Sequence, residues 1–493
     1  MIQVGGISAW SQSTDEARQE LENRVNAMQT QLEAAQQRIA EEHAELVQLQ
    51  QQFKTLKNQI HPELADASPA APPDAAADLQ RAVAEIQERQ AIHQAEIQVH
   101  EQEKVESLSK FPVKLHGLVL LNASLNNGSV DNPIEPLVAI PSGGNAAHGS
   151  LTATGRQTLL GLEAAGPSLW GARTYANLEM DFAGGLSSGG YTVGSSSFRL
   201  RTAEMQIEWP KTRVQAGVAP LILTPYYANS YFSIATPAMS WSGALWGWLP
   251  QLSLDRRFDI SDNQHINLQA ALADIPDAGS NGSGSLGAVS AAERSRYPAT
   301  EARVAWQGRF QLPASVGIGG YWSPHSFAST LPNPAGNFNA WAGTADWKIS
   351  LPAAMQFSGS IYDGAGLGGL SAGAFKDSIL VYRQLDVQNS ENMVGLRDAG
   401  GWAQLKMKPI RLLEFNAAFG EDDANSVQLR SADLNLSNPY IGLVRNQTAF
   451  GNFVFRPTST LLISGEYRRI RSWQITGAVA DASLYGLAAG YAF

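Results

Sequence analysis

The feature that most constrains this chain is an alternation of apolar and polar side chains, in stretches of roughly ten residues, from Phe111 to the C-terminus. In residues 172–182, Ala, Thr, Leu, Met and Phe occupy one face, whereas Arg, Tyr, Asn, Glu and Asp occupy the other. A period of two predicts β-strands that separate an apolar environment from a polar one. The sequence holds no run approaching the roughly eighteen apolar residues of a transmembrane helix.

The alternation predicts sixteen strands. We expect them at residues 113–124, 157–166, 172–183, 198–210, 212–221, 249–258, 264–274, 300–311, 313–323, 338–350, 353–363, 400–409, 411–421, 444–456, 459–471 and 483–493. The connections after even-numbered strands are tight, as at Trp209–Thr212. The long connections follow odd-numbered strands and include 125–156, 222–248, 275–299, 364–399 and 422–443. An even strand count with short turns at one end and long loops at the other is typical of outer-membrane β-barrels, and a soluble sandwich has no reason to show it.

The last strand adds a more specific feature. Tyr491 and Phe493 lie on its apolar face, and Phe493 is the terminal residue. This ending resembles the signal by which the barrel-insertion machinery recognises outer-membrane barrels. Both ends of the barrel then lie on the short-turn side, which we expect to face the periplasm.

Residues 1–110 have a different, helical periodicity. We expect a coiled-coil stalk within residues 1–61, a Pro/Ala linker at 62–78, a second helical segment at 79–110 and the β-barrel at 111–493. The heptad seam of the stalk is formed by Leu21, Val25, Met28, Leu32, Ile39, Leu46, Leu49, Phe53, Leu56 and Ile60. It would reach roughly 60 Å, and it does not choose between two and three chains. In the second segment, partly solvated coiled-coil histidines are favoured over a metal site at His93 and His100.

Composition excludes several classes of function. The absence of cysteine removes disulfide scaffolds, zinc ribbons and thiol catalysis. A sequence pI of 5.4 and the lack of a basic run argue against nucleic acid as a partner. The few histidines of the barrel part form no catalytic motif, so we expect no enzyme activity, no metal and no cofactor. We see no signal peptide at Met1–Val4, although a barrel of this kind must be exported.

Sixteen strands enclose an aqueous channel, whose charged lining sets selectivity. The candidate pore-lining residues are Arg173, Arg213, Arg257, Arg303, Lys348, Lys406, Lys408, Arg468, Glu179 and Asp181. The other inward-phase charges are Lys114, His116, Glu163, Glu204, Glu208, Asp255, Glu301, Asp346, Glu414 and Glu466. The near balance of bases and acids predicts many structural pairs. The Lys406/Lys408 pair and Arg468, which has no obvious partner, tilt the prediction toward anionic solutes.

The loop at residues 222–249 is unusually aromatic. Its candidate constriction residues are Tyr226, Tyr227, Tyr231, Phe232, Trp241 and Trp246. We interpret it as a constriction loop inside the barrel; a packed extracellular cap or a trimer contact is the alternative. Arg199 and Arg201 share a phase with Met205, which we expect to face lipid. Either a β-bulge reverses the phase, or these arginines lie at the outer rim and meet lipopolysaccharide phosphates.

The whole plan resembles the DcaP-type trimeric porins and, more distantly, the phosphate-selective porins O and P. The resemblance is carried by Gly155–Leu162, by Phe198–Arg201 and by Gln215–Val218 before the aromatic loop. It implies a homotrimer that passes small anions, including dicarboxylates, through an arginine-lined constriction with Arg199 and Arg201 pointing inward. We therefore expect a porin in the outer membrane of a Gram-negative bacterium, in contact with lipid and lipopolysaccharide. The alternative is an envelope tether whose stalk reaches toward peptidoglycan.

Overall fold

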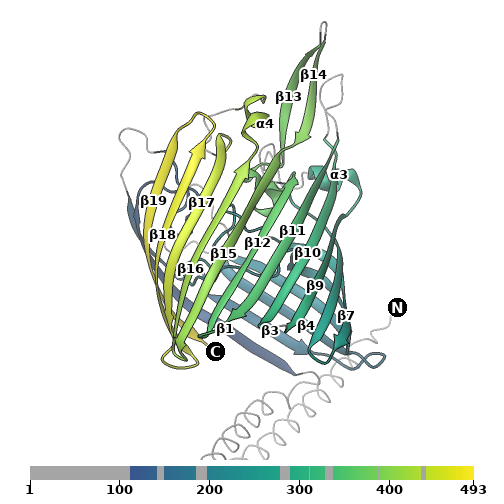
Figure 1. Ribbon diagram of the computed structural model, residues 1–493, viewed down its shortest axis with the longest axis vertical. Coiled ribbons are helices and arrows are strands. Elements are labelled where there is room, and N and C mark those ends of the chain that lie inside the picture. The colour runs from purple at the N-terminus through teal and green to yellow at the C-terminus, as the bar shows by residue number, and fades with distance from the viewer. Residues whose placement is uncertain are drawn as a thin grey trace, which may run out of the picture. The chain divides into compact units, whose positions relative to one another are not determined.

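The computed structural model describes residues 112–141, 149–184, 197–277, 289–309, 311–327, 337–385, 388–432, 434 and 440–493. The predicted stalk, linker and second helical segment lie outside the described residues. The alternating part of the chain forms one closed antiparallel barrel (Figure 1), in which β1 (Val113–Asn127) pairs with β19 (Val479–Ala492). The interior of this barrel is therefore enclosed on all sides by strands.

The barrel has sixteen strand positions, because β2 (Ser150–Thr154) and β3 (Leu159–Ala165) pair in turn with the two halves of β1. The other strands are β4 (Arg173–Gly184), β5 (Ser197–Trp209), β6 (Thr212–Pro220), β7 (Trp248–Ser261), β8 (Gln264–Ala273), β9 (Ala299–Arg309), β10 (Pro313–His325), β11 (Phe338–Leu351), β12 (Met355–Ala365), β15 (Arg397–Ile410), β16 (Leu413–Ala424), β17 (Leu443–Phe455) and β18 (Leu461–Gln474). Each predicted strand coincides with one of these positions, so the expected sixteen-stranded barrel is confirmed. The sequence missed β2, which lies within the predicted loop 125–156.

The two ends of the barrel differ. Short turns join the strands at one end, such as Pro210–Lys211 between β5 and β6, and we call it the short-turn end. The other, the long-loop end, carries α3 (Ala291–Ser295), α4 (Ser426–Arg430), η1 (Gly368–Leu370), η2 (Gly373–Phe375) and the hairpin of β13 (Ser378–Leu385) and β14 (Gln388–Gly395). The predicted long connection at 364–399 is found between β12 and β15, but it contains its own two-stranded sheet, which the sequence analysis missed.

Burial follows the period of two along the strands. On β18, Leu461 and Ile463 are exposed on the outer wall, whereas Leu462 between them is buried. Exposed large apolar side chains lie on the outer wall all around the barrel, and the inward positions hold most of the buried polar residues. In the part of the chain that the structure describes, no helix is long and apolar enough to span a bilayer.

Candidate functional site

The connection between β6 and β7, residues 221–247, folds into the barrel, and we call it the crossing segment. All but one of its residues are buried or half-buried, the exposed one being Pro225. Its backbone is held from opposite sides of the barrel, since Gln157, just before β3, donates to the carbonyl of Phe232, and Thr344 on β11 donates to that of Leu223. The crossing segment therefore bridges the barrel interior.

Gln157 holds three backbone groups of the crossing segment at once. Its Nε2 donates to the Phe232 carbonyl at 2.9 Å, and its Oε1 accepts from the amides of Ile234 at 2.7 Å and Ala235 at 3.2 Å. The side chain is fully buried. The sequence analysis included Gln157 as the first residue of the predicted strand 157–166 and in the resemblance, but not as a site residue, because an amide in a break between two strands leaves no periodic pattern.

A second set of contacts ties the crossing segment to β15–β18. The Asn229 amide donates to Oε1 of Gln404, and the Ser230 hydroxyl donates to Oε2 of Glu466 at 2.6 Å. Arg468 forms an ion pair with Glu466 at 2.7 Å and donates to the Ser233 hydroxyl at 2.8 Å. Its side chain is 1% exposed. The prediction that Arg468 lacks a partner is therefore wrong: this arginine fixes the crossing segment and faces no open space.

Arg303 is a second inward arginine that is covered. It lies on β9 and forms a bidentate pair with Asp346 on β11, with N–O distances of 2.7 and 2.8 Å. Both side chains are buried, so the expectation that Arg303 lines open space is also wrong. The physical reason is that the crossing segment occupies part of the barrel interior. Some inward-pointing charged side chains are therefore buried, although they would be exposed to water in an empty barrel.

Arg199 and Arg201 both point inward, because a β-bulge interrupts β5. Glu179 on β4 pairs with Thr202, but the next residue, Met180, pairs with Leu200, so Arg201 is the extra residue. Arg201 contacts Glu179 at 2.6 Å, and Arg199 contacts Asp181 at 2.6 Å. The bulge is thus the correct one of the two alternatives, and the rim position is excluded.

The two arginines also bind the crossing segment. Arg199 donates to the carbonyl of Ala235 at 2.6 Å, and Arg201 donates to that of Ile234 at 2.8 Å. Their guanidinium carbons lie 5.1 and 4.4 Å from the ring centre of Trp248, at the start of β7. Arg199 remains partly exposed. It is therefore positioned both to hold the crossing segment and to meet a solute on the long-loop side.

A cavity of about 480 Å³ lies next to Arg199. Trp241, Trp246 and Trp248 line it, and Trp241 is stacked on Phe375 of η2 at 4.6 Å between ring centres. Lys376 also lines the cavity, and burial lowers the pKa of this lysine to about 7. Of the six predicted aromatic residues of the loop, Trp241 and Trp246 thus form part of the wall of this cavity.

Exposed cations gather on the opposite, short-turn side of the crossing segment. Lys406, Lys408 and Arg456 lie 3.5, 3.6 and 3.9 Å from the carboxylate of Glu414, which is itself buried. Lys348 on β11 lies on the same stretch of wall, and its ammonium is 5.5 Å from the ring centre of Tyr226. We call Lys348, Lys406, Lys408 and Arg456 the basic cluster. It holds three cations around the Glu414 carboxylate and a fourth, Lys348, on a nearby strand.

The crossing segment borders the basic cluster directly. Arg456 donates to the Tyr231 hydroxyl at 2.8 Å, and the Asn229 side chain donates to Glu414. The sequence analysis placed Arg456 at the end of a strand and missed it as an interior residue. Its even number puts it in phase with Asn452 and Val454, which point inward, so the pattern did contain the information.

The wall of β4–β8 carries paired charges instead. Arg173 lies 3.1 Å from Glu208, and Arg213 lies 3.4 Å from Asp255. Arg257 contacts Asp259 on the same strand at 2.6 Å. The side chains of these three predicted residues are 72%, 42% and 47% exposed, and each has a carboxylate partner. We therefore expect this wall to contribute little net charge to the interior.

Among the residues that the structure describes, no group of three or more His, Asp or Glu side chains is placed to hold a metal ion. The chemistry of the interior is thus that of cations, carboxylates, hydroxyls and aromatic rings. Such groups can bind and select solutes by charge and size.

No protein-family model matches the chain, and no curated protein matches it in sequence. Solved structures do match. The outer membrane channel DcaP of Acinetobacter baumannii is 18% identical, with a TM-score of 0.56 over 78% of this chain and 99% of that one. OprB of Pseudomonas putida is 11% identical (TM-score 0.45, 77% and 94% covered), and OmpT of Vibrio cholerae is 10% identical (TM-score 0.44, 78% and 98% covered). In fold, this chain is a sixteen-stranded barrel of the DcaP type.

Proposed function

We propose that the chain is an outer-membrane pore for the passive diffusion of small hydrophilic solutes, with a preference for anions such as dicarboxylates. The observation that carries this proposal is the basic cluster, in which Lys406, Lys408 and Arg456 share the single carboxylate of Glu414 beside Lys348. The cluster keeps a net positive charge next to the crossing segment. A pore that is narrow at this point selects by charge.

The placement of the cations supports an anionic solute with two charged groups. Lys406 and Lys408 point inward from the same strand and stand about 7 Å apart along it. Arg199, with Lys376 nearby, offers a second partly exposed cation on the other side of the crossing segment. A solute that enters from the long-loop end would meet Arg199 first and the basic cluster second.

The proposal extends to location and assembly. The fold is that of a protein described as an outer membrane channel, which supports the bacterial outer membrane as the site of this chain. We further propose a homotrimer, with the stalk of residues 1–61 in the periplasm. Chemical cross-linking of the full chain in native outer membranes would test this: a ladder that ends at three copies supports it, and a monomer only refutes it.

The pore itself is tested by single-channel conductance of the refolded full chain in planar bilayers, with the reversal potential measured across a salt gradient. We expect stepwise openings in groups of three and an anion-selective reversal potential. A heat-modifiable, folded barrel that stays silent would refute the pore and favour the tether.

The anion preference is tested by the Lys406→Gln/Lys408→Gln variant. An exposed charge about 6 Å from a solute ion contributes roughly 0.4 kcal/mol in water at 0.1 M salt, so the loss of two charges should lower the anion permeability roughly fourfold. Arg256→Gln is the matched control, because Arg256 is an exposed arginine on the outer wall of β7. Equal reversal potentials in both variants would refute the role of the basic cluster.

A further inference from the structure

The outer wall of β12–β19 changes character toward the long-loop end. Phe419, Tyr467 and Tyr485 are exposed aromatic residues on this wall, as in the aromatic girdles of membrane barrels. Beyond them, the outward side chains become charged: Asp363, Arg397, Glu421, Asp423, Arg445, Arg469, Arg471 and Asp481. These charges therefore lie at the level of lipid headgroups.

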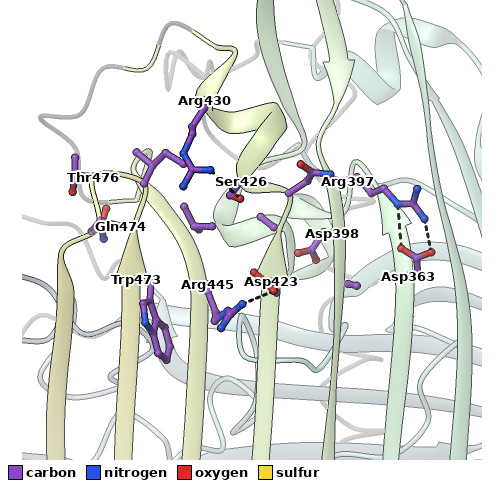
Figure 2. A pocket seen from close by; sticks show the side chains of 16 residues that line it. Asp363, Arg397, Asp398, Asp423, Ser426, Arg430, Arg445, Trp473, Gln474 and Thr476 are labelled. Carbon is purple, nitrogen blue, oxygen red and sulfur yellow. Dashed lines mark hydrogen bonds and ion pairs between the residues drawn. The ribbon is translucent and has the colours of Figure 1, made fainter.

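A cavity of about 740 Å³ opens on this part of the wall. Figure 2 shows Arg397, Arg430 and Arg445 around it, with Trp473 at its lower edge. Arg430 is the last residue of α4, and the other three lie at the ends of β15, β17 and β18. We call this cavity the rim pocket.

Carboxylates hold two of the three arginines of the rim pocket in place. Arg397 lies 2.9 Å from Asp363, and Arg445 lies 2.9 Å from Asp423 (Figure 2). Arg430 has no carboxylate within 4.0 Å in the described part of the chain, and its side chain donates only a long hydrogen bond of 3.5 Å to Ser426. Since a guanidinium carries five N–H donors, all three arginines keep donors free for a further anion.

Trp473 adds to the rim pocket. The guanidinium carbons of Arg445 and Arg471 lie 5.5 and 5.0 Å from the centre of its ring. Tryptophan at a membrane interface presents an apolar face to lipid and a polar edge to the headgroups. This arrangement is suited to a ligand that has both an anionic and an apolar part.

An apolar groove of about 920 Å³ lies on the outer wall of the same strands, closer to the short-turn end. Its floor contains Gly451 and Gly465, and Phe415, Phe453 and Leu487 are among its walls. Along β17, Gly451 is six residues from Arg445, or about 20 Å. A lipid whose headgroup occupies the rim pocket could therefore place an acyl chain in this groove.

We propose that the rim pocket binds a phosphate group of a phosphorylated glycolipid of the outer leaflet, with an acyl chain of the same molecule in the apolar groove. Arginine suits this role because its planar fork matches phosphate oxygens in a bidentate manner. The neighbouring groove favours a lipid phosphate over free inorganic phosphate. This site faces away from the barrel interior, so it is independent of the proposed pore.

The test uses the refolded full chain in detergent and measures binding of bisphosphorylated lipid A, of dephosphorylated lipid A and of inorganic phosphate by native mass spectrometry and thermophoresis. We expect dephosphorylated lipid A to bind at least tenfold more weakly than the bisphosphorylated form. Inorganic phosphate, at the same concentration as the lipid, should not displace bound bisphosphorylated lipid A. Equal binding of the two lipids, or displacement by inorganic phosphate, would overturn the proposal.

The variant is Arg430→Gln/Arg445→Gln, and Arg256→Gln, an outer-wall arginine near the short-turn end, is its matched control. We expect the double variant to lose about tenfold in affinity for bisphosphorylated lipid A while the control keeps its affinity. Both variants should keep heat-modifiable mobility and wild-type conductance, which shows that they fold. A folded double variant with unchanged affinity for bisphosphorylated lipid A would overturn the assignment of the rim pocket as a phosphate site. This holds whatever the conductance measurements show about the pore.

Discussion

Arg468→Met is the substitution that most directly probes how the crossing segment is held. Arg468 and Glu466 are buried side by side on β18, and Glu466 accepts hydrogen bonds from Ser230 and Asn452 as well. Removal of one partner of a buried ion pair leaves an uncompensated charge and costs about 3–5 kcal/mol. The lost hydrogen bond to Ser233 adds about 1 kcal/mol.

We expect Arg468→Met to destabilise the crossing segment more than the strands of the barrel. The barrel strands keep their ladders in the variant. The crossing segment loses its attachment at Ser233, whereas the Ser230 hydroxyl can still donate to Glu466. We therefore expect a larger and noisier single-channel conductance, together with a lower midpoint of unfolding in urea. Tryptophan fluorescence in lipid vesicles measures the unfolding.

Glu466→Leu/Arg468→Met is the informative comparison, because it removes both charges together. Replacement of a buried pair by apolar residues is often neutral, so the double variant should recover most of the stability that Arg468→Met loses. An Arg468→Met protein within about 0.5 kcal/mol of the wild type would refute the assignment. A double variant that is less stable than the single one would show that hydrogen bonds to the crossing segment, and not the buried charge, dominate.

Two further predictions concern the same interior. Gly243 has a φ of +105°, and a Cβ there would lie 2.1 Å from the Gly401 carbonyl oxygen, so Gly243→Ala should displace the crossing segment, raise the conductance and cost about 1–3 kcal/mol in urea unfolding. Gly247→Ala is the control, since its Cβ would meet only the Leu249 side chain. Burial lowers the pKa of Lys376 from 10.5 to about 7, so between these values the unfolded chain binds more protons and the free energy of unfolding rises with pH. Urea midpoints at pH 6.5 and 9 should show this rise in the wild type and not in Lys376→Met.

The strands could be predicted because a strand between lipid and polar interior repeats every two residues. This repeat can be read from the sequence without knowing which strands are adjacent in the barrel. The lengths of the connections then distinguish the short-turn end from the long-loop end. The period of two could not assign Arg199 and Arg201 to the inner or the outer face of the barrel. A single extra residue at Arg201 reverses the phase, and the sequence contains nothing that marks a bulge.

The interior could be predicted only in part, because burial inside a barrel depends on what else occupies it. Arg468 and Glu466 are two residues apart on one strand, so their pairing was available from the sequence. That both are covered was not, since Phe232 of the crossing segment covers Arg468 from a distance of more than two hundred residues along the chain. The hairpin of β13 and β14 was missed for a different reason: its strands have eight residues each, and most of β14 is polar, so no apolar–polar alternation marks it.

A count of inward-pointing charges in the sequence is therefore a poor guide to the electrostatic potential inside this barrel. In the sequence, the inward bases and acids nearly balance, which predicts many structural pairs and only a slight tilt toward anionic solutes. The structure separates most of the cations into three groups: buried pairs such as Arg303–Asp346, exposed pairs on β4–β8, and the basic cluster beside Glu414. Buried and paired charges contribute little to the electrostatic potential that a solute meets, so under the proposed function we expect the basic cluster to set the sign of that potential. We therefore expect substitution of the cations that share the Glu414 carboxylate to change ion selectivity. Substitution of a cation that has its own carboxylate partner should change selectivity very little.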